Sequence, residues 1–266
     1  MLRAYVILYV VVLFGPLFFI ALFSFHSSGA MTFPMEGLSL TWYRAFFADH
    51  VFVESFKFSL IVGFTSTLVT TVVGSLVAIA LARLKGWPKQ ALGFLTFAPI
   101  ALPGLFIGIA LLTFFGQIGM ERTLKTVTIA HILIMLPFFI EASRSRLEYF
   151  DLSLEEAARD LGATPWNAFR LVTLPIIAPT LIGAAILSFA ISFDEVIITV
   201  FVSGSESTLP LAIWSSLRRT ATPIINAASV LALASVLLLI LTFAVLGWWR
   251  RRRKIIGRQA IEGTAT

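Results

Sequence analysis

Long apolar stretches alternate with shorter polar segments along this chain of 266 residues. Crossing the hydrocarbon core of a bilayer takes about 20 helical residues, because the core is about 30 Å thick. Six stretches reach this length, at residues 4–25, 56–82, 91–115, 124–142, 179–202 and 225–249. Residues 1–266 contain no internal repeat and no low-complexity linker. The pattern predicts a single all-α membrane domain with six transmembrane helices.

The first apolar stretch shares one feature with a signal peptide, because Arg3 gives it a basic start. Its apolar part is longer than the roughly 7–15 residues of a signal-peptide core, and no convincing cleavage motif follows it. We therefore expect residues 4–25 to form a retained helix.

Basic residues set the expected orientation, since cytoplasmic loops of membrane proteins are rich in Lys and Arg. With a cytoplasmic N-terminus, fourteen of the 20 Lys and Arg lie inside: Arg3, Arg83, Lys85, Lys89, Arg144, Arg146, Arg159, Arg170, Arg250, Arg251, Arg252, Arg253, Lys254 and Arg258. The other six lie outside: Arg44, Lys57, Arg122, Lys125, Arg218 and Arg219. Both termini and the loop 143–178 are therefore expected in the cytoplasm. The basic tail suits a topology anchor, with a regulatory lipid sensor as the alternative.

Composition supports a membrane location and excludes other classes. Hydrophobic residues make up 58% of the chain and charged residues 13%, whereas soluble domains carry about 25% charged residues. The net charge of +6 follows from the basic cytoplasmic segments, so it does not indicate nucleic-acid binding. Cysteine is absent, which excludes disulfides and thiolate metal sites.

The loop 143–178 is polar and predicts two short helices. Ser153 followed by Glu156 forms a capping-box pattern for the first helix, and Gly162 suits the left-handed turn that ends it. Thr164 and Pro165 are typical of the start of the second helix. Prolines at positions 175 and 179 are expected to mark the turn into the fifth span.

The loop has two interpretations on local chemistry alone. Ala157 and Ala158 allow another surface to approach closely, and Trp166, Phe169 and Leu171 add apolar contact. A rigid projection of this kind could transmit a push from a soluble partner. Alternatively, it is a hairpin that packs only on its own helix bundle.

The same loop resembles the EAA signature of ABC importer permeases. The matching positions are Glu156-Ala157-Ala158, Gly162, Val172 and Leu174-Pro175. Val172 replaces the usual Ile, while every spacing agrees. The resemblance implies the type I importer fold and makes this loop the coupling helix, which docks on a cytoplasmic ATPase dimer that binds ATP and Mg²⁺. It also implies a sister permease, a periplasmic solute-binding protein and an inner-membrane location.

Three further segments resemble polyamine permeases of the spermidine/putrescine type. They are residues 99–111, 192–196 and 208–211. Importers of ferric iron, opine-like compounds and aminoalkylphosphonates share much of this pattern and stay as alternatives. The chain has no G-x-x-x-x-G-K-[ST] phosphate loop, so a separate ATPase is expected to hydrolyse ATP. The chain itself is then expected to be no enzyme and to bind no cofactor.

Polar residues at membrane depth are candidates for the substrate pathway. Asp194 and Glu195 lie beyond the middle of the fifth span and would attract a cationic solute. Alternatively, these acids pair with a basic residue on a neighbouring helix or lie at the outer interface. Ser192 is a second candidate, although serines in membrane helices more often bond between helices. Pro103 interrupts the third span, either to expose carbonyl groups to a cavity or as a packing kink.

Remaining features discriminate between function classes. Residues 40–47 and 211–219 are predicted to form amphipathic helices on the outer side. The resemblance implies that such helices contact the binding protein, whereas local chemistry favours simple anchoring at the membrane interface.

His131 lacks the companion ligands that a metal site needs. A membrane-embedded enzyme would need a catalytic cluster at depth, and a channel or secondary transporter would need no ATPase-docking loop.

Overall fold

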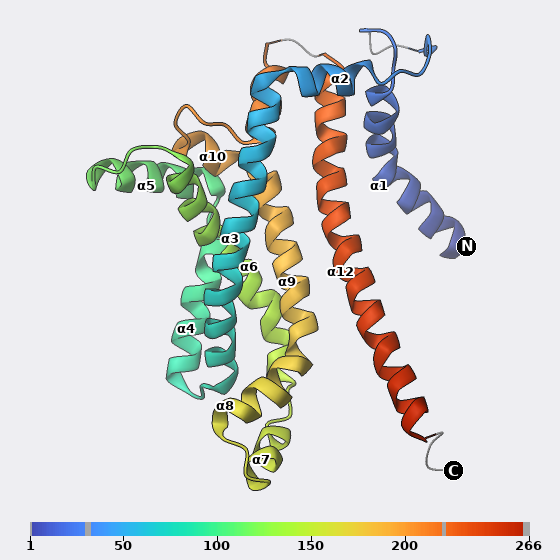
Figure 1. Ribbon diagram of the computed structural model, residues 1–266. Helices are drawn as coiled ribbons and strands as arrows, with labels where there is room; N and C mark the ends of the chain where they lie inside the picture. The colour runs from blue at the N-terminus through green and yellow to red at the C-terminus, as the bar shows by residue number, and fades with distance from the viewer. Residues whose placement is uncertain (1, 30–32, 220–221, 263–266) are drawn as a thin grey trace. The chain divides into compact units, whose positions relative to one another are not determined.

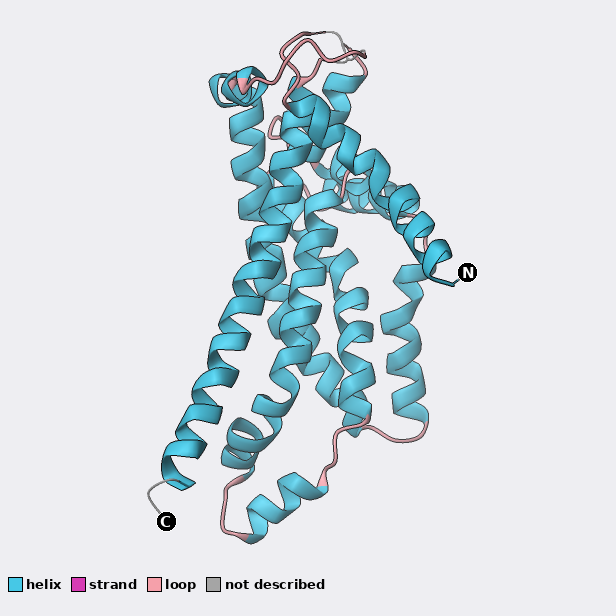
Figure 2. Cartoon of the chain, turned by 90° about the vertical axis from the view of Figure 1, so that its right-hand side faces the viewer, coloured by secondary structure: helices cyan, strands magenta, loops and turns pink. Residues whose placement is uncertain are grey.

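The computed structural model describes residues 2–29, 33–219 and 222–262. Helices account for the regular structure there (Figure 2). The one exception in these residues is an isolated bridge between His26 and Leu38. The α-helices are α1 (Leu2–Ser24), α2 (Thr41–Ala48), α3 (His50–Arg83), α4 (Trp87–Phe97), α5 (Gly104–Gln117), α6 (Leu124–Glu148), α7 (Ser153–Asp160), α8 (Pro165–Ala168), α9 (Leu174–Asp194), α10 (Ile197–Val202), α11 (Leu209–Leu217) and α12 (Ile224–Glu262). A 3₁₀ turn covers Ala98–Ala101, and a π-helical turn covers Phe169–Thr173.

Five continuous helices in the described residues are long and apolar enough to cross a membrane. They are α1, α3, α6, the unbroken helix Pro165–Asp194 and the Ile224–Gly247 part of α12. The pair Trp87–Ala101 and Gly104–Gln117 is together long and apolar enough as well but bends by 102° at its break, so the described residues hold five spans, or six if this bent pair counts as one. Helices satisfy their own backbone groups, which lipid cannot do. The expected all-α membrane class is therefore confirmed.

The chain divides into two compact units, Met1–Ala232 and Leu233–Thr266. In the first unit, α3, α6 and α9 pack against one another (Figure 1). Buried apolar side chains from all three helices form one cluster: Ala78, Leu81, Phe139, Ile140, Leu147, Ile177, Leu181 and Ala184. Because lipid tails are as apolar as these side chains, close packing between the helices is what holds the cluster together.

The two ends of this three-helix bundle carry different features. The hairpin of α7 and α8 extends beyond one end, and α2 lies at the other (Figure 1). Both amphipathic stretches expected on the outer side do form helices, α2 and α11. Trp42 Nε1 donates to the His26 carbonyl at 2.7 Å, and Tyr43 Oη lies 2.8 Å from Ser24 Oγ, so α2 is fastened to the end of α1.

The third span is interrupted at Pro103, as expected from the sequence, and turns sharply between Ala101 and Gly104, where Pro103 is the N-cap of α5. The fifth span differs from the expectation. The fifth span starts earlier than residue 179 and ends at Asp194, and α10 follows after a gap of two residues. Proline explains the first break because it lacks a backbone N–H. The second break contains no Pro or Gly, so the apolar pattern gave no sign of it.

Candidate functional site

The first helix of the hairpin, α7, begins at Ser153, but the expected capping box does not form. Leu152 is the N-cap, and no side chain at that position caps the helix. Instead, Asp151 Oδ1 accepts from the Ser153 backbone N–H at 3.0 Å. Hydrogen bonds from the Ser153 hydroxyl and backbone hold the pKa of Asp151 below its ordinary value. A carboxylate two residues upstream is a stronger acceptor than a hydroxyl, so it replaces the serine as the cap.

The turn after α7 has the geometry that the sequence predicts. Gly162 adopts φ +90°, a value that L residues rarely adopt. The Ala163 N–H donates to the Ala158 carbonyl at 3.0 Å, and the Gly162 N–H donates to the Arg159 carbonyl at 2.9 Å. These two bonds are those of a Schellman motif, which satisfies the last carbonyls of a helix. Gly162 therefore fixes the direction in which the chain leaves α7.

The second helix of the hairpin runs directly into the membrane-spanning helix. Thr164 caps α8 by accepting from the Asn167 N–H at 3.3 Å, and Pro165 follows as its first residue. From Pro165 to Asp194 the helix is unbroken over 30 residues. The expected turn at positions 175 and 179 is therefore absent.

A π-helical turn lets the helix pass through Pro175. The Leu174 N–H donates to the Phe169 carbonyl, five residues back, so the turn Phe169–Thr173 is wider than an α-helical one. A proline clashes with the carbonyl four residues before it, and a wider turn relieves that clash. Leu174 and Pro175, the last residues of the matched signature, thus lie at the point where the hairpin becomes α9.

The outward side of the hairpin presents a mixed polar and apolar surface. Glu156 and Ala157 are exposed, and Ala158 is half-buried. Leu161 is 91% exposed, and Trp166 and Leu171 are also exposed. A shallow depression between the two helices is lined by Glu156, Arg159, Asp160, Ala163 and Pro165. Exposed apolar groups around a small depression are typical of a docking surface for another protein.

The break between α9 and α10 contains both acids predicted for the pathway, and the two differ. Glu195 is half-buried, and its Oε1 accepts from the Ile198 N–H at 2.8 Å, which caps α10. Asp194 is exposed and is the last residue of α9. No described residue forms a hydrogen bond or ion pair with the Asp194 carboxylate. Asp194 is therefore the more exposed of the two acids and the one without a polar partner among the described residues.

His131 on α6 holds both sides of this break, a role that the sequence did not reveal. Thr199 Oγ1 donates to the Glu195 carbonyl at 2.8 Å, so it accepts from His131 Nε2 at 2.9 Å. Ser192 Oγ lies 2.8 Å from Nδ1, so both ring nitrogens have a hydroxyl partner. His131 is fully buried. Ser192 is buried too, and its hydroxyl is engaged by His131.

The bent pair of α4 and α5 contacts α10, the short helix that follows the break after α9. A Cβ on Gly104, directly after Pro103, would lie 3.8 Å from side-chain atoms of Ile197 and Ile198 at the start of α10. Further along α5, a Cβ on Gly108 would lie 2.5 Å from Phe201 Cδ2, so only glycine permits this approach. The structure thus brings the Pro103 corner next to the segment that follows Asp194 and Glu195.

A helical bundle with an exposed hairpin at one end and a bent apolar helix pair within it defines a polytopic membrane protein. The chain belongs to the family of binding-protein-dependent transport system inner membrane components, whose model matches residues 70–255. It is accordingly a multi-pass inner-membrane protein and a non-catalytic membrane component of a transport system.

Individual relatives agree with this family. The chain is 32% identical to the putrescine transport system permease protein PotI of Escherichia coli K12, over 84% of this chain and 82% of the relative. It is 34% identical to the spermidine/putrescine transport system permease protein PotC of Haemophilus influenzae, over 78% and 81%. A solved bacterial ABC transporter that imports alginate has a similar fold, with a TM-score of 0.71 at 15% identity and 91% coverage of both chains.

Proposed function

We propose that this permease imports a polyamine such as putrescine or spermidine. Two relatives that are named as polyamine permeases cover most of the chain, and the chemistry of the α9–α10 break is consistent with them. The complex would contain a sister permease, a periplasmic binding protein and a cytoplasmic ATPase dimer that supplies ATP and Mg²⁺ chemistry. Both termini and the hairpin of α7 and α8 would face the cytoplasm.

The observation that supports coupling is the unbroken helix from Pro165 to Asp194. At about 1.5 Å per residue, its 30 residues span about 45 Å. One end belongs to the hairpin with Glu156, Ala157, Ala158 and Gly162, and the other end carries Asp194. Since a helix is stiff, a displacement of the hairpin shifts the acid at the far end. ATP binding to the partner would thereby favour one orientation of the bundle over the other.

The charge at the break supports a cationic solute. The C-terminus of α9 carries the negative end of its helix dipole, and Asp194 adds a carboxylate at the same point. Glu195 is already engaged as the cap of α10. In a partly dehydrated cavity the effective dielectric constant is low, so a carboxylate attracts a cation more strongly than it does in water.

The test is the uptake of labelled putrescine by cells or vesicles with Asp194→Asn and Glu195→Gln, made separately. We expect Asp194→Asn to slow uptake at an unchanged membrane level, since the binding protein still captures solute. The matched control is Glu54→Gln in the first turns of α3, because it removes an acid that is already paired with Lys57 at 2.8 Å. If both acid variants transport like the parent, the acids are structural. Uptake of a neutral or anionic solute in preference to polyamines would contradict the polyamine assignment.

A further inference from the structure

Glu155, the residue before the matched Glu-Ala-Ala sequence, faces the interior of the molecule. Its Oε2 lies 2.9 Å from Arg83 Nη2, and its Oε1 lies 3.3 Å from the same nitrogen. Arg83 is the last residue of α3, and 72 residues separate the two. The Glu155 side chain is only 12% exposed. The contact therefore joins the hairpin to the end of a membrane-spanning helix.

A second contact joins Glu155 to the start of α9. Thr173 Oγ1 donates to Glu155 Oε2 at 3.2 Å. Thr173 is buried and is the last residue of the π-helical turn, immediately before α9. One carboxylate thus accepts hydrogen bonds from the ends of two different spans.

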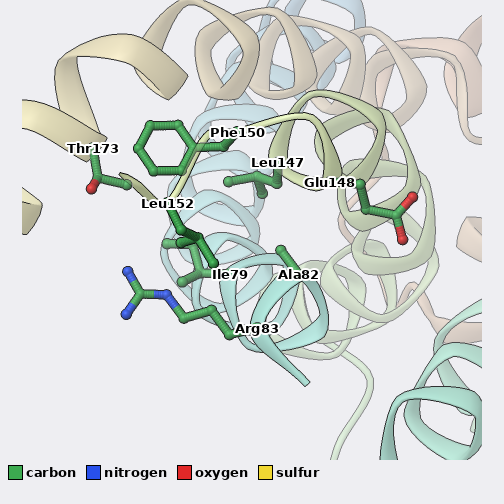
Figure 3. Close-up of a pocket in the computed structure, with 8 residues that line it drawn as sticks. All are labelled: Ile79, Ala82, Arg83, Leu147, Glu148, Phe150, Leu152 and Thr173. Carbon is green, nitrogen blue, oxygen red and sulfur yellow. The ribbon is translucent and has the colours of Figure 1, made fainter. Parts of the chain in front are cut away.

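The surroundings of this carboxylate favour the pairing. Arg83 and Thr173 line a pocket whose wall is largely apolar, with Ile79, Ala82, Leu147, Phe150 and Leu152 (Figure 3). The Arg83 side chain is 45% exposed and the Glu155 side chain 12%, so the acid is the more shielded partner of the pair. Glu148 also lines this pocket, but its carboxylate points away from Arg83 (Figure 3).

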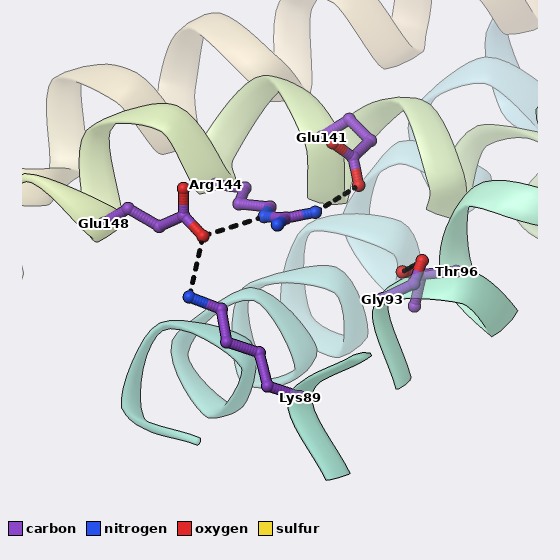
Figure 4. Close-up of polar contacts among 6 residues, drawn as sticks. All are labelled: Lys89, Gly93, Thr96, Glu141, Arg144 and Glu148. Carbon is purple, nitrogen blue, oxygen red and sulfur yellow. Dashed lines mark hydrogen bonds and ion pairs between the residues drawn. The ribbon is translucent and has the colours of Figure 1, made fainter. Parts of the chain in front are cut away.

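Glu148 is instead paired with other cations at this end of the bundle. Its Oε1 lies 2.9 Å from Lys89 Nζ and 3.0 Å from Arg144 Nε (Figure 4). That network joins α4 to α6 and does not include α7. Among the described acids of this region, Glu155 is therefore the one that ties the hairpin to a span.

From these contacts we infer that Glu155 is a positioning residue that transmits movement of the hairpin to α3 as well as α9. Successive residues of a helix point about 100° apart, so the exposed Glu156 faces outward while Glu155 faces inward. The covalent chain connects the hairpin directly to α9, and the Arg83–Glu155 contact gives it a direct polar link to the end of α3. This link adds to the packing of α3 against α9, so a movement of the hairpin reaches the ends of both helices. This inference rests on the proposed coupling role of the hairpin.

The test uses the complete importer in lipid vesicles and three variants of it. Two are the single variants Glu155→Gln and Arg83→Gln. The third is a double variant that exchanges the two charges, Arg83→Glu together with Glu155→Arg. Two quantities are measured, the amount of ATPase that copurifies with the permease and the number of putrescine molecules taken up per ATP hydrolysed. We expect normal ATPase retention in each single variant and about tenfold fewer molecules per ATP. The exchanged pair should recover most of that loss, because the charge contact is restored.

The matched control is Lys89→Gln, which breaks an ion pair at the same end of the bundle without touching the hairpin. Its transport per ATP should stay near that of the parent. If Glu155→Gln does not insert, Arg83→Gln decides the question with the same two measurements. Three results would each overturn the inference. The single variants could take up as many putrescine molecules per ATP as the parent, or Lys89→Gln could lose as much uptake per ATP as they do. The double variant with exchanged charges could also fail to recover uptake per ATP. A parent complex with no ATP-driven uptake would instead refute the proposed function.

Discussion

Thr199 Oγ1 lies 2.9 Å from His131 Nε2, and this contact holds the first turn of α10 against α6. On its other nitrogen the same ring holds Ser192, in the last turn of α9. A buried ring with both nitrogens bonded fixes the geometry of the break between them. The position of Asp194, at the end of α9, therefore depends on a residue that is itself fully buried.

Thr199→Val should loosen this break. The variant keeps the shape of the side chain but leaves the buried His131 N–H without an acceptor, which costs about 1–3 kcal/mol. We expect a lower midpoint of thermal unfolding and slower uptake at a normal membrane level. Thr199→Ser keeps the hydroxyl and should stay near the parent in both measurements. A Thr199→Val protein that unfolds and transports like the parent would show that the contact is unimportant.

Gly162→Val should abolish transport while the permease still inserts. Valine at a positive φ is strained by at least about 1–2 kcal/mol, so the turn after α7 would be rebuilt. Substrate-stimulated ATPase activity of the assembled importer is the measurement. Gly183→Ala on α9 is the control, because Gly183 has no positive φ and no neighbour within 4 Å of an added Cβ. Normal substrate-stimulated ATPase activity in the Gly162→Val importer would show that coupling does not need the turn at Gly162.

Gly108→Ala should push α5 away from α10. The added Cβ would lie 2.5 Å from Phe201 Cδ2, a distance that real Cβ atoms essentially never show. We expect slower uptake, and we expect Phe201→Leu in the same protein to recover part of it by making space. Uptake measured at equal membrane levels checks both variants. An additive loss in the double variant would mean that the two side chains act independently.

Reporter fusions test the orientation of the chain. A reporter fused after Lys89 or after Lys254 should give a cytoplasmic signal, and a reporter fused near Glu206 should give a periplasmic signal. The reason is the excess of Lys and Arg in the segments assigned to the cytoplasm. A periplasmic reading after Lys254 would rule out a cytoplasmic C-terminus.

Much of the hairpin could be predicted from the sequence because its signals are local. Gly162, Thr164 and Pro165 mark a turn and a helix start through their own backbone chemistry, and the structure confirms all three. Ser153 was the wrong cap because Asp151, two residues upstream, accepts from the Ser153 N–H group. The continuity of α9 through Pro175 was missed because a π-helical turn relieves the proline clash.

The broken helix could not be predicted in this way. Residues 179–202 form one largely apolar stretch without Pro or Gly after position 183, and the break at Glu195 is stabilised by tertiary contacts. His131 lies 61 residues before Ser192 and 68 before Thr199. No periodicity or motif relates positions so far apart, so only the packing of α6 against α9 and α10 reveals the role of His131.

The most direct test of ATP-driven polyamine import is the accumulation of labelled putrescine in vesicles that contain the complete importer with its binding protein. We predict accumulation against the gradient when ATP is present on the cytoplasmic side, and a loss of accumulation when the partner ATPase is inactivated. Accumulation that continues with an inactive ATPase would contradict this mechanism, as would an importer that ignores polyamines and takes up a neutral or anionic solute.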